Sequence, residues 1–398
     1  MTDKGMKEIK KCQRDIEKML KKMEGYSKKF AKAAERLRSL NGTGINSENK
    51  TVIDENAEKI QMVLDDFSLD AQVDLAVRGP RVTRYEIKLG PGVEIEEITD
   101  IQDMIAMHLH TACVRMVAPI PGRAKIGIEV PNQNPETVIL NEVFDSEQWL
   151  NTSAAIPLAI GKNAVGEPVV LDLGHAQHLL ISGAIGTGKS DCVDSMIVSM
   201  IKKFTPEELK FIMFDPKIVE LDIFRDLPHL RMPIVKDSES FVEILRDAAI
   251  EIDNRYNILA VSGVKNISEY NAGKNEKMPR LVIVIDELYG LMKCENKTDV
   301  ENVICCIAQK GRAAGVHLII ATEFPRSITG IIKANIPGRL CFQVRSLIES
   351  RIVWDEQGAE KLLGQGDMLI QYGFFTERVQ GALISNDEIK KIIEEIEL

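Results

Sequence analysis

Hydrophobic positions in the first half of the chain follow two different periods. Residues 83–89 and residues 126–130 each carry an apolar, aromatic or β-branched side chain at every second position, and Pro131 ends the second stretch. A period of two is typical of a β-strand with one buried face. Residues 99–111 lie between these stretches and are predicted to form a helix. We therefore predict a small α/β domain over residues 46–156.

From residue 157 onward, short apolar segments alternate with helical stretches. The candidate strands are His178–Ser182, Lys210–Phe214, Leu281–Ile285, Val316–Ala321 and Arg339–Val344. Strands that alternate with helices indicate a parallel sheet covered by helices. Residues 157–398 are therefore predicted to form a second, larger α/β domain.

The first forty residues differ from the rest of the chain. Apolar residues recur on a heptad, from Ile9 to Leu37 at one position and from Cys12 to Leu40 three residues later. Such repeats predict a helix that buries one stripe against a partner. The segment carries 13 Lys or Arg residues and 6 Asp or Glu residues. We assign residues 1–45 to a basic N-terminal helix and linker. The helix is either solvated or self-associating, or its lysines contact an acidic surface such as DNA or lipid.

Composition narrows the class of protein. The chain has 44% hydrophobic and 28% charged residues, as soluble globular proteins do. Its net charge of −10 argues against a surface that is basic throughout, although a local basic pore remains compatible with it. No apolar run approaches the roughly 20 residues of a membrane span. The seven cysteines form no Cys-x-x-Cys pair, so we predict no zinc site and a reducing, cytoplasmic location.

The clearest chemical signal is a phosphate-binding loop. Residues 183–190 match the pattern G-x-x-x-x-G-K-[ST] between a predicted strand and a predicted helix. Glycines let the backbone curl so that successive N–H groups point at phosphate, and the start of the helix adds positive potential. Lys189 is predicted to bridge the β- and γ-phosphates of ATP, and Ser190 to supply an oxygen to Mg²⁺. The phosphates would be cradled by Gly183, Ala184, Ile185, Gly186, Thr187 and Gly188.

Hydrolysis of ATP needs more than a loop that binds phosphate, and a pair of carboxylates is the candidate for the additional groups. Leu281–Ile285 is an uninterrupted apolar run, as expected of a strand that is buried on both faces, and it ends in Asp286 and Glu287. In a doubly wound sheet, ligands bind at the carboxyl ends of the strands. We therefore predict that Asp286 holds Mg²⁺ and that Glu287 orients the attacking water.

Two further features each have two interpretations. The segment Asp215–Lys217 follows another apolar strand and would lie at the same edge of the sheet, where it either takes part in chemistry or stabilises a turn. Arg312 precedes the strand predicted at residues 316–321. It is either a solvated surface group or a residue that faces the ATP of another subunit.

Several motifs, in the same order along the chain, resemble the FtsK/SpoIIIE family of DNA translocases. Those in the larger domain are Gly166–Leu173, His178–Gly183, Phe211–Lys217, Ala308–His317, Ile332–Pro337 and Gly358–Leu369. Upstream, Gly79–Arg84 and Gly90–Val93 resemble the β-domain that precedes the motor in that family. The resemblance covers about residues 51–384.

The resemblance implies a RecA-like P-loop ATPase motor over residues 157–398, assembled as a hexameric ring around double-stranded DNA. Arg312 matches the arginine finger of the family, which enters the site of a neighbouring subunit. Lys333 and Arg351 match positions that face DNA or couple it to the nucleotide. We do not expect this chain to carry the membrane-spanning N-terminus or the C-terminal winged-helix domain of the family.

The chain also departs from the family pattern. The family usually has Ala-Thr-Gln-Arg-Pro where this chain has Ala-Thr-Glu-Phe-Pro. Glu323 therefore replaces a sensor-type glutamine, and Phe324 replaces a basic residue that faces DNA. Leu347 stands at another position that is commonly basic. Arg326 and Arg345 lie nearby in the sequence and are expected to compensate as DNA contacts.

The sequence leaves three functions open. The leading hypothesis is a ring-shaped, ATP-driven translocase of double-stranded DNA. The second is a related ATPase that moves conjugative DNA–protein cargo or secreted protein, which would suit Phe324 and Leu347. The third is a nucleotide-binding scaffold with little turnover, which Glu323 would permit. Chromosome partition, sporulation and plasmid or phage DNA movement are all compatible with the first hypothesis.

Overall fold

The computed structural model describes residues 47–397 except residues 121, 275, 295 and 374. The helix predicted within residues 1–45 lies outside the described residues. Contacts divide the chain into two compact units. Of the described residues, the first unit contains residues 47–77 together with Thr83–Val130, and the second contains Arg78–Val82 together with residues 131–397.

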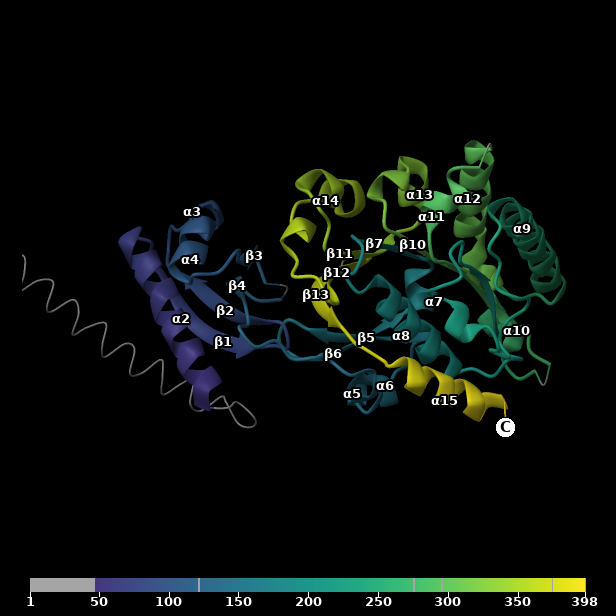
Figure 1. Cartoon of the computed structure of the whole chain (residues 1–398), viewed down its shortest axis with the longest axis horizontal. Coiled ribbons are helices and arrows are strands. Elements are labelled where there is room, and N and C mark those ends of the chain that lie inside the picture. The colour runs from purple at the N-terminus through teal and green to yellow at the C-terminus, as the bar shows by residue number, and fades with distance from the viewer. Residues whose placement is uncertain (1–46, 121, 275, 295, 374, 398) are drawn as a thin grey trace, which may run out of the picture. The chain divides into compact units, whose positions relative to one another are not determined.

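In the residues that the structure describes, the first unit is a four-stranded sheet with helices α2, α3 and α4 (Figure 1). Its strand order is β1-β2-β4-β3, with β1 at Ala71–Arg78, β2 at Val82–Leu89, β3 at Arg115–Val117 and β4 at Ile126–Pro131. The strands predicted at residues 83–89 and 126–130 are confirmed. The helix predicted at residues 99–111 is instead a pair, α3 (Ile95–Asp100) and α4 (Gln102–His108), because Ile101 leaves helical geometry with φ −90° and ψ 9°.

The core of this unit forms between the sheet and α2 (Ser47–Asp66). Ile53, Ile60 and Leu64 are buried on α2 at spacings that place them along one face of a helix. They share one cluster with Tyr85 of β2, whose hydroxyl donates a hydrogen bond to the carbonyl oxygen of Ile53 at 3.3 Å. Burial of this amphipathic face fixes α2 on the sheet.

The second unit is built on a nine-stranded sheet in the order β6-β5-β13-β12-β11-β7-β10-β9-β8. The five strands predicted from the apolar segments are confirmed, and they are the five consecutive parallel strands of this sheet. Antiparallel pairing begins where β11 meets β12. The bounds are β5 Pro157–Asn163, β6 Pro168–Asp172, β7 Leu179–Ser182, β8 Leu209–Phe214, β9 Arg280–Ile285, β10 Val316–Thr322, β11 Gly338–Phe342, β12 Asp367–Tyr372 and β13 Phe375–Gly381.

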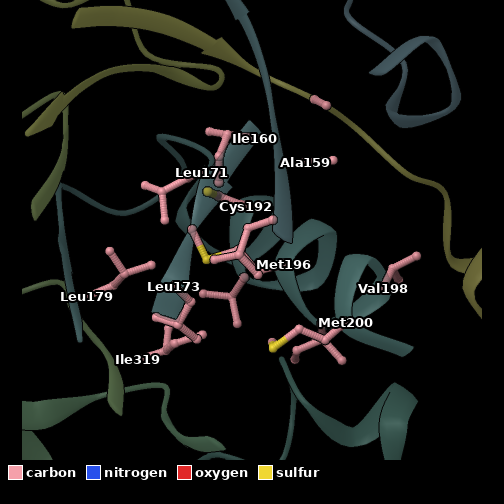
Figure 2. Close-up of a cluster of buried hydrophobic side chains, with 14 of the residues drawn as sticks. Ala159, Ile160, Leu171, Leu173, Leu179, Cys192, Met196, Val198, Met200 and Ile319 are labelled. Carbon is pink, nitrogen blue, oxygen red and sulfur yellow. The ribbon is translucent and has the colours of Figure 1, made fainter. Parts of the chain in front are cut away.

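Helices cover both faces of this sheet, as the uninterrupted apolar strands require. Alternate residues of β7 point to opposite faces, so Leu179 belongs to one hydrophobic cluster and Leu180 to the other. The first cluster includes α8 (Lys189–Ile201) and α15 (Asn386–Glu397), and the second includes α9 (Ser238–Val261) and α12 (Lys297–Ala314). Figure 2 shows Cys192 and Met196 of α8 within the first cluster.

Shorter helices complete the second unit. They are α5 Leu140–Phe144, α6 Glu147–Leu150, α7 Leu173–Ala176, η1 Asp222–Phe224, α10 Ile267–Asn271, α11 Leu288–Leu291, η2 Pro325–Ser327, α13 Gly330–Asn335, α14 Leu347–Trp354 and η3 Ala359–Lys361. Within residues 47–397, none of the helices has both the length and the apolar composition that crossing a bilayer requires.

Candidate active site

The predicted phosphate-binding loop joins β7 to α8. β7 ends at Ser182 and α8 begins at Lys189, so the loop sits at the carboxyl end of a central parallel strand. Gly188 has φ 102°, and a Cβ atom there would lie 2.7 Å from the amide nitrogen of Gly366. A Cβ atom at Gly183 would lie 2.5 Å from Cβ of Phe342. Both positions therefore require glycine, and the strand–loop–helix context predicted from the sequence is present.

Lys189 is buried against this loop. Its Nζ atom donates a hydrogen bond to the carbonyl oxygen of Ala184 at 2.8 Å, and Thr187 Oγ1 donates to the same oxygen at 2.7 Å. Burial lowers the pKa of Lys189, and nearby carboxylates act in the opposite direction, Glu323 most strongly. An ammonium group in this position supplies the positive charge that the phosphates of a nucleotide require. Ile185 lies at the exposed tip of the loop.

Asp286 lies among other acidic groups at the same edge of the sheet. It follows β9, and its amide donates a hydrogen bond to the carbonyl oxygen of Phe214 at 3.0 Å. Burial, and then the negative charges of Asp215, Glu220 and Glu287, raise the pKa of Asp286 to about 7. Within the part of the chain that the structure describes, no three His, Cys, Asp or Glu side chains are grouped so that they could hold a metal ion. Mg²⁺ that binds together with a nucleotide usually takes only one or two carboxylates besides phosphate and water oxygens, and Asp286 fits that role.

Glu287 is buried and held at both carboxylate oxygens. Oε1 accepts hydrogen bonds from Thr322 Oγ1 at 2.6 Å and from the amide of Tyr289 at 2.9 Å. Oε2 accepts a hydrogen bond from the amide of Glu323 at 3.0 Å. These contacts link the end of β9 to the end of β10. Sequence reasoning missed the role of Thr322, because α11, α12 and the strand β10 separate the two residues along the chain.

The carboxylate of Asp215 organises the loop that follows β8. It is fully buried and accepts hydrogen bonds from the five consecutive backbone amides of residues 217–221, at 2.8–3.1 Å. The turn-stabilising interpretation of Asp215 is therefore confirmed. The loop also places Lys217 Nζ 3.6 Å from Glu323 Oε1, so the acid that replaces the expected glutamine has a cationic neighbour.

Arg312 lies away from the phosphate-binding loop of its own chain. It is exposed near the carboxyl end of α12, shortly before β10 begins at Val316. β10 runs parallel to β7, so the amino end of β10 and the loop after β7 are at opposite edges of the sheet. Among the described residues, no hydrogen bond or ion pair engages its guanidinium group. Arg312 therefore lies at the opposite edge of the sheet from the phosphate-binding loop of its own chain.

The four residues predicted to contact DNA are not equivalent. Arg326, Arg345 and Arg351 are exposed, in η2, after β11 and in α14 respectively. Lys333 is instead engaged within the chain, where Nζ donates hydrogen bonds to the carbonyl oxygen of Ile352 at 2.6 Å and to the carboxylate of Asp355 at 2.5 Å. Its contacts hold α13 against the end of α14.

Comparisons with known proteins match nearly the whole described chain. A family model described as the FtsK/SpoIIIE family matches residues 139–278 and 271–329, and one described as the FtsK alpha domain matches residues 36–132. The DNA translocase FtsK of Clostridium tetani is 45% identical over 359 residues, which cover 88% of this chain and 48% of that protein. The DNA translocase SpoIIIE of Bacillus subtilis is 40% identical over 368 residues, covering 89% and 46% respectively. The chain thus spans about half the length of the curated relatives it matches.

Solved structures share the fold. The conjugation coupling protein TcpA of pCW3, in its monomer form with ATPγS, has a TM-score of 0.60 and 20% identity, and the match covers 86% of this chain and 99% of that one. The cytoplasmic domain of the type VII secretion ATPase EccC of Thermomonospora curvata has a TM-score of 0.55 and 22% identity, covering 65% and 34%. The second unit therefore has the RecA-like P-loop ATPase fold that the sequence predicted.

Proposed function

Because this chain belongs to the FtsK/SpoIIIE family, we propose that it is an ATP-hydrolysing motor that moves double-stranded DNA. One observation carries the proposal: the loop Gly183–Ser190 and the pair Asp286–Glu287 meet at the same edge of the parallel sheet. The relatives named DNA translocases supply the class of cargo. We place the motor in the cytoplasm, where its substrate DNA is found.

The proposed chemistry divides among the residues at this edge. The amides of the loop and Lys189 hold the phosphates of ATP. Ser190 and Asp286 are the oxygen donors that fit Mg²⁺, which would neutralise the charge that develops on the transferred phosphoryl group. Glu287 orients the attacking water and accepts its proton. The negative charge of Glu323 would be unfavourable close to the transferred phosphoryl group, and Lys217 offsets that charge.

We further propose that the motor works as a ring, with six subunits as the family resemblance implies. The position of Arg312 supports this arrangement, because the residue is exposed at the edge of the sheet opposite to its own phosphate-binding loop. In a head-to-tail ring, Arg312 would reach the γ-phosphate bound by the next subunit. A guanidinium group there would stabilise the charge of the transition state.

DNA would be held mainly through its phosphates. Arg326, Arg345 and Arg351 are exposed on segments that follow the carboxyl ends of β10 and β11. Such contacts bind the backbone and are largely indifferent to sequence. Each phosphate contact that is removed should reduce the slope of log affinity against log salt by about one. Lys333, which is tied to Asp355, would act by positioning α14.

A second candidate function has a specific observation in its favour. Phe324 and Leu347, which replace residues that are commonly basic in the family, are 42% and 37% exposed. Apolar side chains at these positions would suit a protein or DNA–protein cargo. DNA would then bind without changing the rate of ATP hydrolysis.

The proposed function is tested by steady-state ATP hydrolysis of the purified chain, with and without linear double-stranded DNA at moderate salt. We expect DNA to stimulate ATP hydrolysis. We expect the variants Lys189→Ala and Glu287→Gln to abolish ATP hydrolysis, both with and without DNA. Hydrolysis that ignores DNA would favour the second candidate. No hydrolysis by the wild-type chain would contradict the proposal and favour a nucleotide-binding scaffold.

A further inference from the structure

The carboxylate of Glu287 is restrained by its neighbours. It accepts three hydrogen bonds, two from the end of β10 and one from the start of α11. A carboxylate offers about four lone pairs to donors, so about one is left for a water molecule. The three hydrogen bonds fix the direction of that remaining lone pair, so the way in which Glu287 can orient an attacking water depends on them.

The hydroxyl group of Thr322 is the donor that connects this carboxylate to a surface segment. Its shortest hydrogen bond is donated to Glu287 Oε1 at 2.6 Å, against 3.4 Å to the carbonyl oxygen of Phe324, and it accepts a hydrogen bond from the amide of Phe324 at 3.1 Å. Ser327 Oγ lies 3.0 Å from the same hydroxyl and donates to the carbonyl oxygen of Phe324 at 2.7 Å. Thr322 itself is fully buried. Movement of the Glu323–Ser327 segment therefore shifts the hydroxyl that holds Glu287.

A second connection runs through a pair of aromatic rings. The rings of Phe324 and Tyr289 have centroids 4.6 Å apart, and the two residues are 42% and 36% exposed. The amide of Tyr289 is itself a donor to Glu287 Oε1. A molecule that displaces the Phe324 ring thus acts on Glu287 from both sides.

The surroundings of Phe324 favour a polyanion as that molecule. Arg326 is exposed two residues later in η2, and η2 packs against α14, which carries the exposed Arg351. Arg345 is exposed just before α14. An exposed aromatic ring on a segment that also carries exposed guanidinium groups suits a nucleic acid, because the ring can stack on a base and the guanidinium groups can contact phosphates.

We propose that Thr322 is a positioning residue that restrains Glu287, and that contact between DNA and Phe324 releases the restraint. This inference rests on the proposed function and adds a route by which cargo controls hydrolysis. It assigns Phe324, which looked like a lost DNA contact, to sensing. Thr322 exerts its effect through Glu287 and does not itself contact the nucleotide.

The test compares Thr322→Val with Thr322→Ser in the full chain. Valine has nearly the same shape but no hydroxyl, whereas serine keeps the donor. We expect Thr322→Val to raise hydrolysis without DNA about tenfold, since a hydrogen bond to a charged group is worth about that factor. In Thr322→Val, the ratio of DNA-stimulated to basal hydrolysis should fall towards one. In Thr322→Ser, which keeps the hydroxyl group, both the basal rate and this ratio should stay close to the wild-type values.

Phe324→Ala provides an independent test, because an exposed side chain can be truncated without loss of the fold. We expect the stimulation ratio to fall, while Ile331→Ala, an exposed apolar residue of α13, should leave it within about twofold of wild type. An unchanged ratio in both Thr322→Val and Phe324→Ala would overturn the inference. So would an equal loss of basal and stimulated hydrolysis in Thr322→Val.

Failure of the proposed function can be distinguished from failure of the inference about Thr322. If DNA does not stimulate the wild-type chain, the cargo is wrong, yet a rise of basal hydrolysis in Thr322→Val would still support the restraint. Absence of that rise would contradict the restraint, whatever the cargo is.

Discussion

The amide of Gly366 donates a hydrogen bond to the carbonyl oxygen of Thr187 at 2.8 Å. This contact joins the turn before β12 to the phosphate-binding loop. The turn is itself held firmly, because Gln380 Nε2 donates to the carbonyl oxygen of Gln365 at 2.7 Å, and a buried ion pair joins Asp367 to Arg378 at 2.6 Å. The loop that binds phosphate thus rests on a turn far away in the sequence.

Gly366→Ala should impair nucleotide binding without altering any residue of the loop. Gly366 has φ 90°, which alanine adopts only with strain, and a Cβ atom there would lie 2.6 Å from Gln380 Nε2, so alanine would push away the side chain that holds this turn. We expect kcat/KM for ATP to fall between about tenfold and a hundredfold, as it does when positioning elements shift. Gly373→Ala is the matched control, because Gly373 has φ 60° with open space around it. Equal effects of the two variants on kcat/KM would show that the contact between the Gly366 turn and the phosphate-binding loop does not matter for ATP hydrolysis.

Asp215→Asn should destabilise the second unit. The amide of asparagine lacks one of the two acceptor oxygens that receive the backbone amides of residues 217–221, so buried donors are left unsatisfied. We expect a loss of about 2 kcal/mol or more in the free energy of unfolding by urea. Asp226→Asn, at an exposed position in the same region, should change this value little. A stability loss no larger than that of the control would contradict the role assigned to Asp215.

His178 makes the protein sensitive to acid. Its Nδ1 atom accepts a hydrogen bond from the amide of Leu318 at 2.9 Å, and its Nε2 atom donates one to the carbonyl oxygen of Ala308 at 3.1 Å. Because Nδ1 acts as an acceptor, it carries no proton and the ring is neutral. Burial, and then the proximity of His317, lower the pKa of His178 to about 3. An unfolded histidine has a pKa of about 6.5, so the unfolded chain binds more protons between these values. Stability is therefore full above pH ~6.5 and is lost as the pH falls towards the folded value.

The variant His178→Asn tests this pH dependence. It removes the titrating group, so the slope of unfolding free energy against pH below about 6.5 should become shallower, although overall stability falls. His175→Asn, at an exposed position three residues earlier, should leave the slope unchanged. A slope in His178→Asn as steep as that of wild type would assign the acid sensitivity to other groups.

The proposed action of Arg312 on a neighbouring subunit is tested by mixing inactive variants. Arg312→Ala leaves the phosphate-binding loop intact, and Lys189→Ala leaves the arginine intact. If Arg312 acts across subunits, a mixture contains interfaces with both groups, and hydrolysis should exceed the sum of the two separate proteins. Hydrolysis equal to that sum would show that Arg312 does not act in this way.

Much of the candidate site could be predicted from the sequence because its chemistry is local. The residues of the phosphate-binding loop are contiguous, and Asp286 and Glu287 directly follow a fully apolar strand. Both signals depend only on a strand and the residues after it. The parallel sheet follows for the same reason, since each of its five strands is a short apolar run between helices.

What the sequence could not reveal are contacts between distant segments. The bond from Thr322 to Glu287 depends on the pairing of β10 with β9, and the support of Thr187 by Gly366 depends on where β12 joins the sheet. Lys333 matches a family position assigned to DNA or to coupling, but its ion pair with Asp355 appears only once α13 and α14 are packed. Residue identity shows which chemical groups are present, and the tertiary structure decides which of them come into contact.

The measurement that tests the central claim most directly is displacement of a third strand from double-stranded DNA. A labelled oligonucleotide bound as a triplex at one end of a linear duplex reports movement of a motor along that duplex. The wild-type chain with ATP and Mg²⁺ should strip the oligonucleotide, and Glu287→Gln should leave it bound. Wild-type hydrolysis of ATP that never displaces the oligonucleotide would contradict the claim that this protein moves DNA.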